Sequence, residues 1–340
     1  MNFGCVHAGL IVAALIFPSV STAEEDRVWL RGTYTVQIEN DRITNTDRHY
    51  TNGIRFAWIS DRHEDGPDWS KNLLEMLYPF ADLRAGRAGF SGGHSMFTPE
   101  DTDAVTLIPN ERPYAGWLYL GASVHAETRR ANFGIEFDTL DSVELNLGVV
   151  GPYALGEEVQ NNYHDLIGVA RSNGWDNQLD NELGIMMIFE RKWRPAPWRT
   201  SGFEFDVVPH LGGAVGNVMR MFHAGATARF GQSLSVDYGP PLIQPALSGL
   251  AAIEPSNNFG WYLFAGADLR GVAHNIFLDG NTFSDSHSVD RRVFVGDFQL
   301  GLAAYYENIR IAFTHVFRSR EFEHQRRGDR YGALAISMRY

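Results

Sequence analysis

The sequence predicts an all-β fold: a single antiparallel transmembrane β-barrel of about twelve strands, with a short helix in an extracellular loop. Three observations predict it: an N-terminal export signal, strand-length segments in which apolar and polar residues alternate, and an aromatic residue, Tyr340, that ends the last predicted strand. A soluble β-sandwich would also show the alternation. The export signal, the aromatic ending and the absence of cysteine from the predicted mature chain together favour the barrel.

The N-terminal segment is typical of a secretory signal peptide. Residues 8–20, AGLIVAALIFPSV, form an apolar run, and small residues follow it up to a cleavage position after Ala23. No Lys or Arg precedes the run, but a membrane anchor would need a longer span of about 20 apolar residues. We therefore expect residues 1–23 to be removed and residues 24–340 to form one outer-membrane β-barrel domain.

The composition excludes several classes of protein. The only cysteine, Cys5, lies in the predicted signal segment, so the mature chain has no disulfide framework. The formal net charge of −12 argues against a nucleic-acid partner, which needs a basic surface. An acidic surface is compatible with binding of divalent cations.

Period-two patterning locates the strands. In residues 28–38 every second position is apolar or small, and the final segment repeats the pattern as far as Tyr340. Twelve strands is an even number, as in bacterial single-chain barrels. We place them near residues 28–40, 50–60, 87–97, 115–127, 142–150, 183–193, 201–213, 219–231, 259–272, 290–304, 307–318 and 329–340.

The strand count also predicts which connections face outward. With both termini in the periplasm, the connections after odd-numbered strands are outer loops, and they include residues 41–49, 151–182 and 273–289. Residues 232–258 are long for an inner turn, although the count places them on the inner side. Residues 131–138 can add a further half of a hairpin.

The first outer connection is unusually polar. Residues 38–53 read IENDRITNTDRHYTNG, in which Asn40 and Asp41 end the first predicted strand and Thr51 begins the second. Asn and Asp favour turns because they hydrogen-bond the neighbouring backbone. Taken alone, the composition of this stretch therefore indicates a hairpin turn.

A second outer loop contains a helical pattern. Residues 155–168, LGEEVQNNYHDLIG, repeat apolar residues at a spacing of four, and Gln160 and His164 share a neighbouring stripe of the same helix. A lone loop histidine is most often simply solvated. Here the helix and the first hairpin lie on the same side of the membrane, so His164 is able to meet the polar residues of the hairpin.

Several motifs, taken in order, resemble the lipid A 3′-O-deacylase family. After the Asn-Asp pair come DRHYTNG (47–53), RPYAGW (112–117), GEEVQNNYH (156–164) and GWDNQL (174–179), which span most of the mature chain. The resemblance implies a twelve-stranded outer-membrane barrel that acts on lipopolysaccharide in the outer leaflet. It implies hydrolysis of the 3′-position acyl ester of lipid A, with the active site facing the cell exterior.

The resemblance also implies a set of catalytic residues, which by motif fall on Asn40, Asp41, Thr51 and His164, with Gln160 as a supporting neighbour. In this scheme His164 activates a water molecule, a role for which imidazole is suited near neutral pH. Asn40 and Asp41 offer oxygen ligands of the kind that Ca²⁺ prefers. A bound Ca²⁺ would polarise the ester carbonyl and stabilise the oxyanion.

The sequence departs from the family pattern in two places. Residues 103–105, Asp-Ala-Val, stand where the family has Lys-Arg, and Ala170 and Ser172 stand where it has an acidic residue and a tyrosine. These changes leave the hydrolytic residues in place and concern the grip on the substrate and the calcium geometry. On charge alone, the candidates to replace the missing phosphate contacts are Arg84, Arg87 and Arg171, and we expect Gln160 and Arg171 to bind the substrate.

Two alternatives stay open. Residues 89–93, GFSGG, match the GxSxG motif, which would suit an outer-membrane phospholipase A with a Ser91–His pair. That motif needs a strand–turn–helix elbow, however, and here a Gly-rich stretch leads into a strand. The second alternative is a non-enzymatic porin or binding barrel, although twelve strands enclose a narrow lumen. We expect the lipid A-hydrolysing barrel to be a monomer.

Overall fold

The computed structural model describes residues 31–41, 49–61, 76, 83–132, 135–240 and 256–340. The predicted signal segment, residues 1–23, lies outside the described residues, so cleavage after Ala23 stays a prediction.

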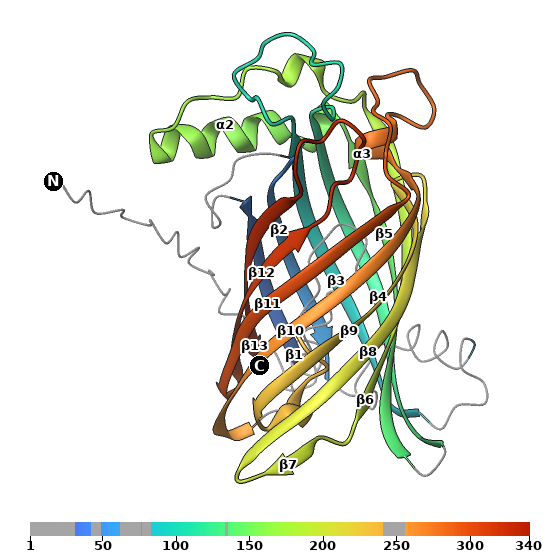
Figure 1. Cartoon of the computed structure of the whole chain (residues 1–340), viewed down its shortest axis with the longest axis vertical. Helices are drawn as coiled ribbons and strands as arrows, with labels where there is room; N and C mark the ends of the chain where they lie inside the picture. The colour runs from blue at the N-terminus through green and yellow to red at the C-terminus, as the bar shows by residue number, and fades with distance from the viewer. Residues whose placement is uncertain (1–30, 42–48, 62–75, 77–82, 133–134, 241–255) are drawn as a thin grey trace, which may run out of the picture.

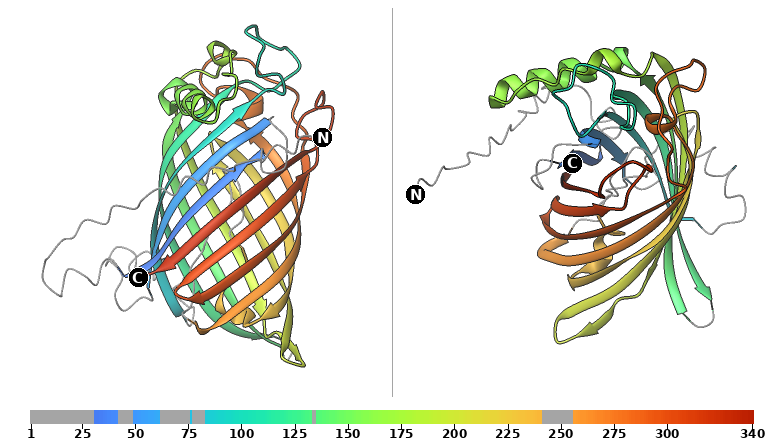
Figure 2. Two further views of the ribbon diagram at one scale, coloured as in Figure 1. Left: turned by 90° about the vertical axis from the view of Figure 1, so that its left-hand side faces the viewer. Right: turned by 45° about the horizontal axis from the view of Figure 1, so that its top comes forward.

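Within the described residues, twelve long antiparallel strands close into a barrel and tilt across its wall (Figure 1 and Figure 2). They are β1 (Gly32–Asn40), β2 (His49–Ser60), β3 (Leu83–Thr98), β4 (Ala115–Asn132), β5 (Ile135–Val150), β6 (Glu182–Pro195), β8 (Phe203–Gly216), β9 (Met219–Gln232), β10 (Ser256–Asn275), β11 (Phe294–Glu307), β12 (Ile309–Arg318) and β13 (Asp329–Arg339). The barrel closes because β1 pairs with β13 and β6 pairs with β8. A short strand, β7 (Trp198–Thr200), pairs with the start of β8.

Short helices occupy the connections between strands. They are η4 (Pro152–Ala154), α2 (Gly156–Ile167), η5 (Trp175–Asn177), η6 (Leu234–Val236) and α3 (Ile276–Asp279). The helices α2 and α3 lie at the same end of the barrel, which we call the upper rim because it is at the top of Figure 1. Among the described residues, no helix has the length and apolarity needed to cross a membrane.

The two faces of the barrel wall differ in the way a membrane barrel requires. Outward positions of β4–β6 are apolar and exposed, as at Leu120 and Leu183. Inward positions carry buried charges that pair with each other, as where Arg55 Nη2 lies 2.8 Å from Glu144 Oε2. Apolar residues outside and polar residues inside are the arrangement of a transmembrane β-barrel. The predicted fold class and strand number are therefore confirmed.

Some strand ends differ from the prediction. The fifth strand was expected to begin near residue 142, but β5 begins at Ile135, and β4 continues to Asn132. Residues 131–132 and 135–138 thus belong to the paired strands β4 and β5. Their paired ends are polar, with Arg129 Nε 3.0 Å from Asp138 Oδ1, so the apolar alternation that marks a strand in the sequence fades there while backbone pairing continues.

The described part of the connection between β9 and β10, residues 233–240, lies at the lower end of the barrel, on the side that the strand count predicted. Its first residues turn into the lumen, where the Asp237 carboxylate accepts a hydrogen bond from Arg229 Nη1 at 2.6 Å. Arg310 Nε lies 3.1 Å from the second oxygen of the same carboxylate. Residues 233–240 are therefore part of the polar interior and not a simple turn; residues 241–255 lie outside the described part of the chain.

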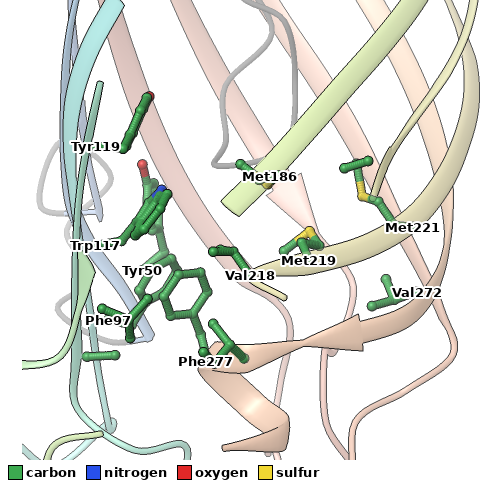
Figure 3. Packing of buried hydrophobic residues seen from close by; sticks show 14 of the residues in the cluster. Tyr50, Phe97, Trp117, Tyr119, Met186, Val218, Met219, Met221, Val272 and Phe277 are labelled. Atoms are coloured by element: carbon green, nitrogen blue, oxygen red, sulfur yellow. The ribbon is translucent and has the colours of Figure 1, made fainter. Parts of the chain in front are cut away.

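An apolar cluster fills the lumen below the upper rim (Figure 3). Phe277 of α3 points toward Phe97 of β3, and their ring centroids lie 4.0 Å apart in a stacked arrangement. Trp117, Val218 and further residues of the facing strands belong to the same buried cluster. A polar site at the upper rim must therefore form around or outside this apolar cluster.

Candidate active site

The upper rim carries the predicted site residues. Asn40 and Asp41 stand at the end of β1, Thr51 near the start of β2, and Gln160 and His164 on α2 in the connection from β5 to β6. Antiparallel topology places all of these segments at one end of the barrel, as the strand count predicted. Figures 1 and 2 show α2 at this rim, extending outward beyond the barrel wall.

Register shows which face of the wall lies beside α2. Asn40 is paired with Asn52, Asn52 with Met96, and Met96 with Gly116, so these residues form one row across β1–β4. Directly paired residues in antiparallel strands point to the same face. This row points outward, because Leu118, two residues after Gly116, is exposed on the outer surface. The outward-facing Asn40 is nevertheless buried.

The start of α2 is fixed because the chain at Ala154 and Gly156 lies close to this row. A Cβ atom on Gly116 would lie 2.9 Å from Ala154 Cβ and 3.3 Å from the Gly156 nitrogen, so the two segments meet at a distance that only glycine allows. His94, which points outward from β3, donates a hydrogen bond from Nε2 to the Ala154 carbonyl at 2.7 Å. The helix is thus attached to the outer face of the barrel and not to its lumen.

The helix α2 is amphipathic with its polar side inward. Glu157 and Glu158 in the first turn favour the helix through its dipole, and Gly168 ends it in the left-handed conformation. Gln160, Asn161 and His164 are buried, whereas the apolar residues Val159, Tyr163, Leu166 and Ile167 are exposed. His164 is only 3% exposed, so it is not simply a solvated loop histidine.

Hydrogen bonds orient both buried side chains. His164 Nδ1 lies 2.6 Å from the Ala170 carbonyl oxygen, which can only accept, so Nδ1 carries the proton. In the neutral ring the lone pair is then on Nε2. Gln160 Oε1 accepts a hydrogen bond from Trp175 Nε1 at 2.8 Å, while Gln160 Nε2 has no hydrogen-bond partner within the described part of the chain. Both side chains therefore keep one polar nitrogen uncommitted.

The segment after α2 folds back onto the helix. Asn161 Oδ1 accepts a hydrogen bond from the Ser172 backbone nitrogen at 2.9 Å, which holds the carbonyl of Ala170 near His164. The contact with His164 uses the backbone of Ala170 and needs no particular side chain. The departures from the family pattern at Ala170 and Ser172 are therefore compatible with the orientation of the histidine.

Two of the family-like motifs have a positioning role that the sequence did not reveal. Tyr114 of the RPYAGW motif packs against Trp175 of the GWDNQL motif, with ring centroids 4.9 Å apart. The Leu179 backbone nitrogen donates to the Tyr114 carbonyl at 2.9 Å. Trp175 in turn holds Gln160, so the two motifs act as a support for α2. The sequence did contain one indication of this support, because each of the two motifs carries an aromatic residue.

A β-bulge turns Thr51 to the outer face. The register of β2 against β3 shifts between Tyr50 and Asn52, and bulges of this kind redirect side chains. Tyr50 points into the lumen, where its hydroxyl donates to Glu39. Thr51 Oγ1 instead lies 2.8 Å from Thr98 Oγ1. Thr98 is on the outward face of β3, as His94 and Met96 are. Thr51 and Asn40 thus share the wall face that carries α2.

The three arginines proposed to bind phosphate lie in different places. Arg171 is exposed, and its Nη2 pairs with Asp165 Oδ2 at 2.5 Å; this hydrogen bond lowers the pKa of Asp165. Arg87 is buried in the lumen and bonds the carbonyl of Ser60, at the lower end of β2. The assignment of Arg87 to substrate binding was wrong, since charge alone does not show which end of a strand a residue occupies. The side chain of Arg84 lies outside the described residues.

The alternative nucleophile lies away from the rim. Ser91 is within β3 with no strand–turn–helix elbow, and its hydroxyl donates to Glu144 Oε1 at 3.0 Å in the lumen. His49, from the polar first hairpin, is also committed elsewhere. Its Nδ1 lies 2.7 Å from Asp329 Oδ1 and its Nε2 lies 3.2 Å from Glu111 Oε2. Neither residue adds a catalytic group to the outer wall.

The donors available to a metal ion at the rim are hard oxygens. The Asp41 carboxylate and the Asn40 carboxamide are adjacent in the chain, and both side chains are buried. Carboxylate and carboxamide oxygens suit Ca²⁺, which takes six to eight such ligands including water. The chemistry of this pair therefore fits the predicted calcium ion.

Two comparisons with known proteins find a similarity to LpxR. The family model described as "Outer membrane protein LpxR" matches residues 10–340. Among solved structures, LpxR from Salmonella typhimurium superposes with a TM-score of 0.73 at 18% identity, covering 91% of this chain and 100% of that one. The translocator domain of the autotransporter NalP from Neisseria meningitidis superposes with a TM-score of only 0.38 at 10% identity, covering 91% of this chain and 88% of that one. A search of curated protein sequences finds no match.

Proposed function

Because the chain belongs to the LpxR family of outer membrane proteins, the lipid A 3′-O-deacylase family that its motifs resemble, we propose that it hydrolyses the 3′-position acyl ester of lipid A. It acts as a monomer on lipopolysaccharide in the outer leaflet, with the upper rim facing the cell exterior. The single observation that carries the proposal is the buried His164, oriented by a backbone carbonyl above the outer wall of the barrel.

His164 serves as the general base. Its Nδ1–H is committed to the Ala170 carbonyl, so the lone pair on Nε2 is available to take a proton from water. Burial of the ring removes competing solvent, and the carbonyl fixes the tautomer as a carboxylate would in a serine hydrolase. The imidazole then returns the proton to the leaving alkoxide.

The outer wall supplies the groups that face the ester. The row from Gly116 to Asn40 crosses three strand spacings, roughly 14 Å. His164 follows Gly156, which approaches Gly116, by eight residues, and this is about 12 Å along α2. The helix can therefore carry His164 past β3 toward the ends of β2 and β1. There Thr51 orients water or substrate through its hydroxyl, and Asn40 and Asp41 would hold a calcium ion. A bound Ca²⁺ would supply electrophilic stabilisation of the ester oxygen.

The lipid reaches this site from the membrane side. The exposed apolar face of α2, which includes Leu166 at 67% exposure, continues the lipid-facing belt of Leu118 and Leu120 on β4. An amphipathic helix with an exposed apolar face lies in the membrane interface. Acyl chains of the substrate then stay in hydrocarbon while the ester bond lies between α2 and the wall. Arg171, which follows the C-terminal end of α2, pairs with the exposed Asp165 and is the residue that exchanges this partner for a lipid A phosphate.

Mass spectrometry of lipid A tests the proposal. Cells that express the parent chain should lose the 3′-linked acyl or acyloxyacyl group, and cells that express His164→Ala should keep it. His324→Ala is the matched control, because His324 is an exposed histidine in a loop of the same rim and should leave the activity intact. Heat-modifiable migration on gels verifies that each variant is folded. An unchanged lipid profile with the folded parent chain contradicts the function.

Two further variants and a conductance measurement separate the two alternatives. Loss of activity with Ser91→Ala but not with Asp41→Ala would support a phospholipase that uses Ser91. Conductance in planar bilayers without acyl release would support a porin. The apolar cluster around Phe277 disfavours conductance, because it fills the lumen of a narrow barrel.

A further inference from the structure

Three potential metal ligands converge in the lumen, on the β8–β10 side of the barrel. His210 Nε2 and His223 Nδ1 each lie 2.9 Å from Asp268 Oδ2, and all three donor atoms lie within 4.8 Å of one another. The side chains point inward, since their chain neighbours Leu211, Phe222 and Leu269 are exposed on the outer surface. The candidate active site lies on the outer face of β1–β4, so this cluster is separate from it.

Two glycines make the convergence possible. His210 is paired with Gly225 and His223 with Gly212, so each imidazole on one strand faces a glycine on the other. A Cβ on Gly225 would lie 2.5 Å from His210 Nε2, and a Cβ on Gly212 would lie 2.5 Å from His223 Nε2. Asp268 is the partner of Gly225 on the other side, and it reaches over this glycine to both rings.

The surroundings favour a cation over a simple hydrogen-bonded cluster. Arg270 Nε lies 3.2 Å from Asp268 Oδ1, which fixes the carboxylate and leaves Oδ2 directed at the two imidazoles. A charged group that orients a ligand in this way is common next to bound metals. His210 and His223 are both buried, and each directs a ring nitrogen at the same carboxylate oxygen, a convergence of three donor atoms that a shared cation explains.

We propose that His210, His223 and Asp268 bind one divalent transition-metal ion of the Zn²⁺ class, which ties together β8, β9 and β10. Two imidazoles and one carboxylate are a donor set for Zn²⁺ and related ions, with the remaining coordination open to water. Ca²⁺ and Mg²⁺ are disfavoured because they take oxygen ligands. The site is structural, since its ligands are buried inside the lumen, and it does not depend on the proposed deacylase activity.

Metal binding and thermal unfolding test the site. The full mature protein, folded in detergent and stripped with a chelator, should bind about one Zn²⁺ and unfold at a higher temperature with it, but not with Mg²⁺. His210→Gln, His223→Gln and Asp268→Asn should each weaken Zn²⁺ binding by at least about 100-fold, the upper range of losses for ligand-supporting groups. His324→Gln, at the exposed rim, should bind Zn²⁺ as the parent does.

Two further measurements keep the outcome decisive. All titrations are repeated in an Asp41→Ala background, which removes a rim donor that could hold Zn²⁺ itself. The absorption spectrum of Co²⁺ bound to the parent protein needs no lumenal variant and should show ligand-field bands of nitrogen and oxygen coordination. Absence of these bands, absence of Zn²⁺ binding in the Asp41→Ala background, or binding that survives all three lumenal substitutions would overturn the proposal.

Discussion

The lower lumen and the helix α2 at the upper rim both have buried polar side chains, but these side chains are compensated differently. In the lower lumen, Arg229 Nη2 lies 2.5 Å from Asp206 Oδ2 and its Nη1 lies 2.6 Å from Asp237 Oδ1, so charges neutralise each other. At the rim, Gln160 and His164 are held by an indole N–H and a backbone carbonyl. Opposite charges stabilise the first region, whereas neutral hydrogen bonds orient side chains in the second.

The difference indicates which region carries stability and which carries chemistry. A buried ion pair is satisfied only while both partners remain, so removing one leaves an uncompensated charge. A side chain fixed by one neutral hydrogen bond keeps a second polar atom for a ligand, as Gln160 Nε2 does. Substitutions in the lower lumen should therefore change unfolding, and substitutions at the rim should change activity in a barrel that stays folded.

The largest expected effect is that of Arg229→Met on stability. Loss of the guanidinium leaves the buried Asp206 and Asp237 without a shared counter-charge, and breaking a buried ion pair costs about 3–5 kcal/mol. Denaturant unfolding of the detergent-folded protein measures this change. Activity per folded molecule should be unaltered, because Arg229 is remote from α2.

Arg199→Met is the matched control. Arg199 Nε lies 3.0 Å from Glu204 Oε1 near the same end of the barrel, but the arginine is 71% exposed. Exposed ion pairs contribute about 0–1 kcal/mol, so this variant should unfold almost like the parent. Equal losses for the two variants would show that burial does not distinguish these ion pairs.

A smaller effect, on activity and not on stability, is expected for Trp175→Phe at the rim. Phenylalanine keeps an aromatic ring against Tyr114 but removes the N–H that Gln160 Oε1 accepts. An unsatisfied buried acceptor costs about 1–3 kcal/mol, so we expect lipid A deacylation to fall about tenfold or more. The unfolding midpoint should change little, since α2 lies outside the barrel wall.

The role of Gln160 in this effect has its own test. In a Gln160→Ala background, Trp175→Phe should cause little further loss of activity, because the hydrogen bond is already absent. Additive losses would show that Trp175 acts by packing alone. Trp198→Phe, at the lower end and 65% exposed, should leave activity unchanged.

The sequence predicted those features that depend on local pattern. Alternation located twelve strands, and counting them placed Asn40, Thr51 and His164 at the same end of the barrel. Strand ends were less predictable, as at β5, because polar pairs continue the hairpin beyond the apolar belt. Arg87 was misassigned, since its place depends on where β3 begins.

Contacts between distant segments needed the structure. The pairing of Arg310 with Asp237 joins residues more than 70 positions apart, and it depends on how the β9–β10 connection folds back into the lumen. The tautomer of His164 depends on a single carbonyl six residues further along the chain. Neither residue spacing nor composition specifies such contacts, because many folded arrangements share the same pattern.

The smallest expected effect is on how stability depends on acidic pH, and it again differs between the lumen and the rim. Burial alone would raise the pKa of Asp237, but Arg310 and Arg229 outweigh burial and lower it. A lowered folded-state pKa contributes stability above the unfolded value of about 3.9, and this contribution is lost as pH falls through the folded-state pKa. Unfolding measured from pH 5 to pH 3 should therefore show declining stability in the parent and a shallower decline in Asp237→Asn.

Asp165→Asn is the rim counterpart in that titration. The Arg171 hydrogen bond lowers the pKa of Asp165 as well. From the pKa shifts alone, removing either carboxylate would make stability depend less steeply on pH. The Asp165–Arg171 pair is exposed, however, and water and salt screen it. We expect the stability of Asp165→Asn to fall with pH as steeply as that of the parent. If Asp165→Asn flattened the acid response as much as Asp237→Asn, acid stability would not depend on burial in the lumen.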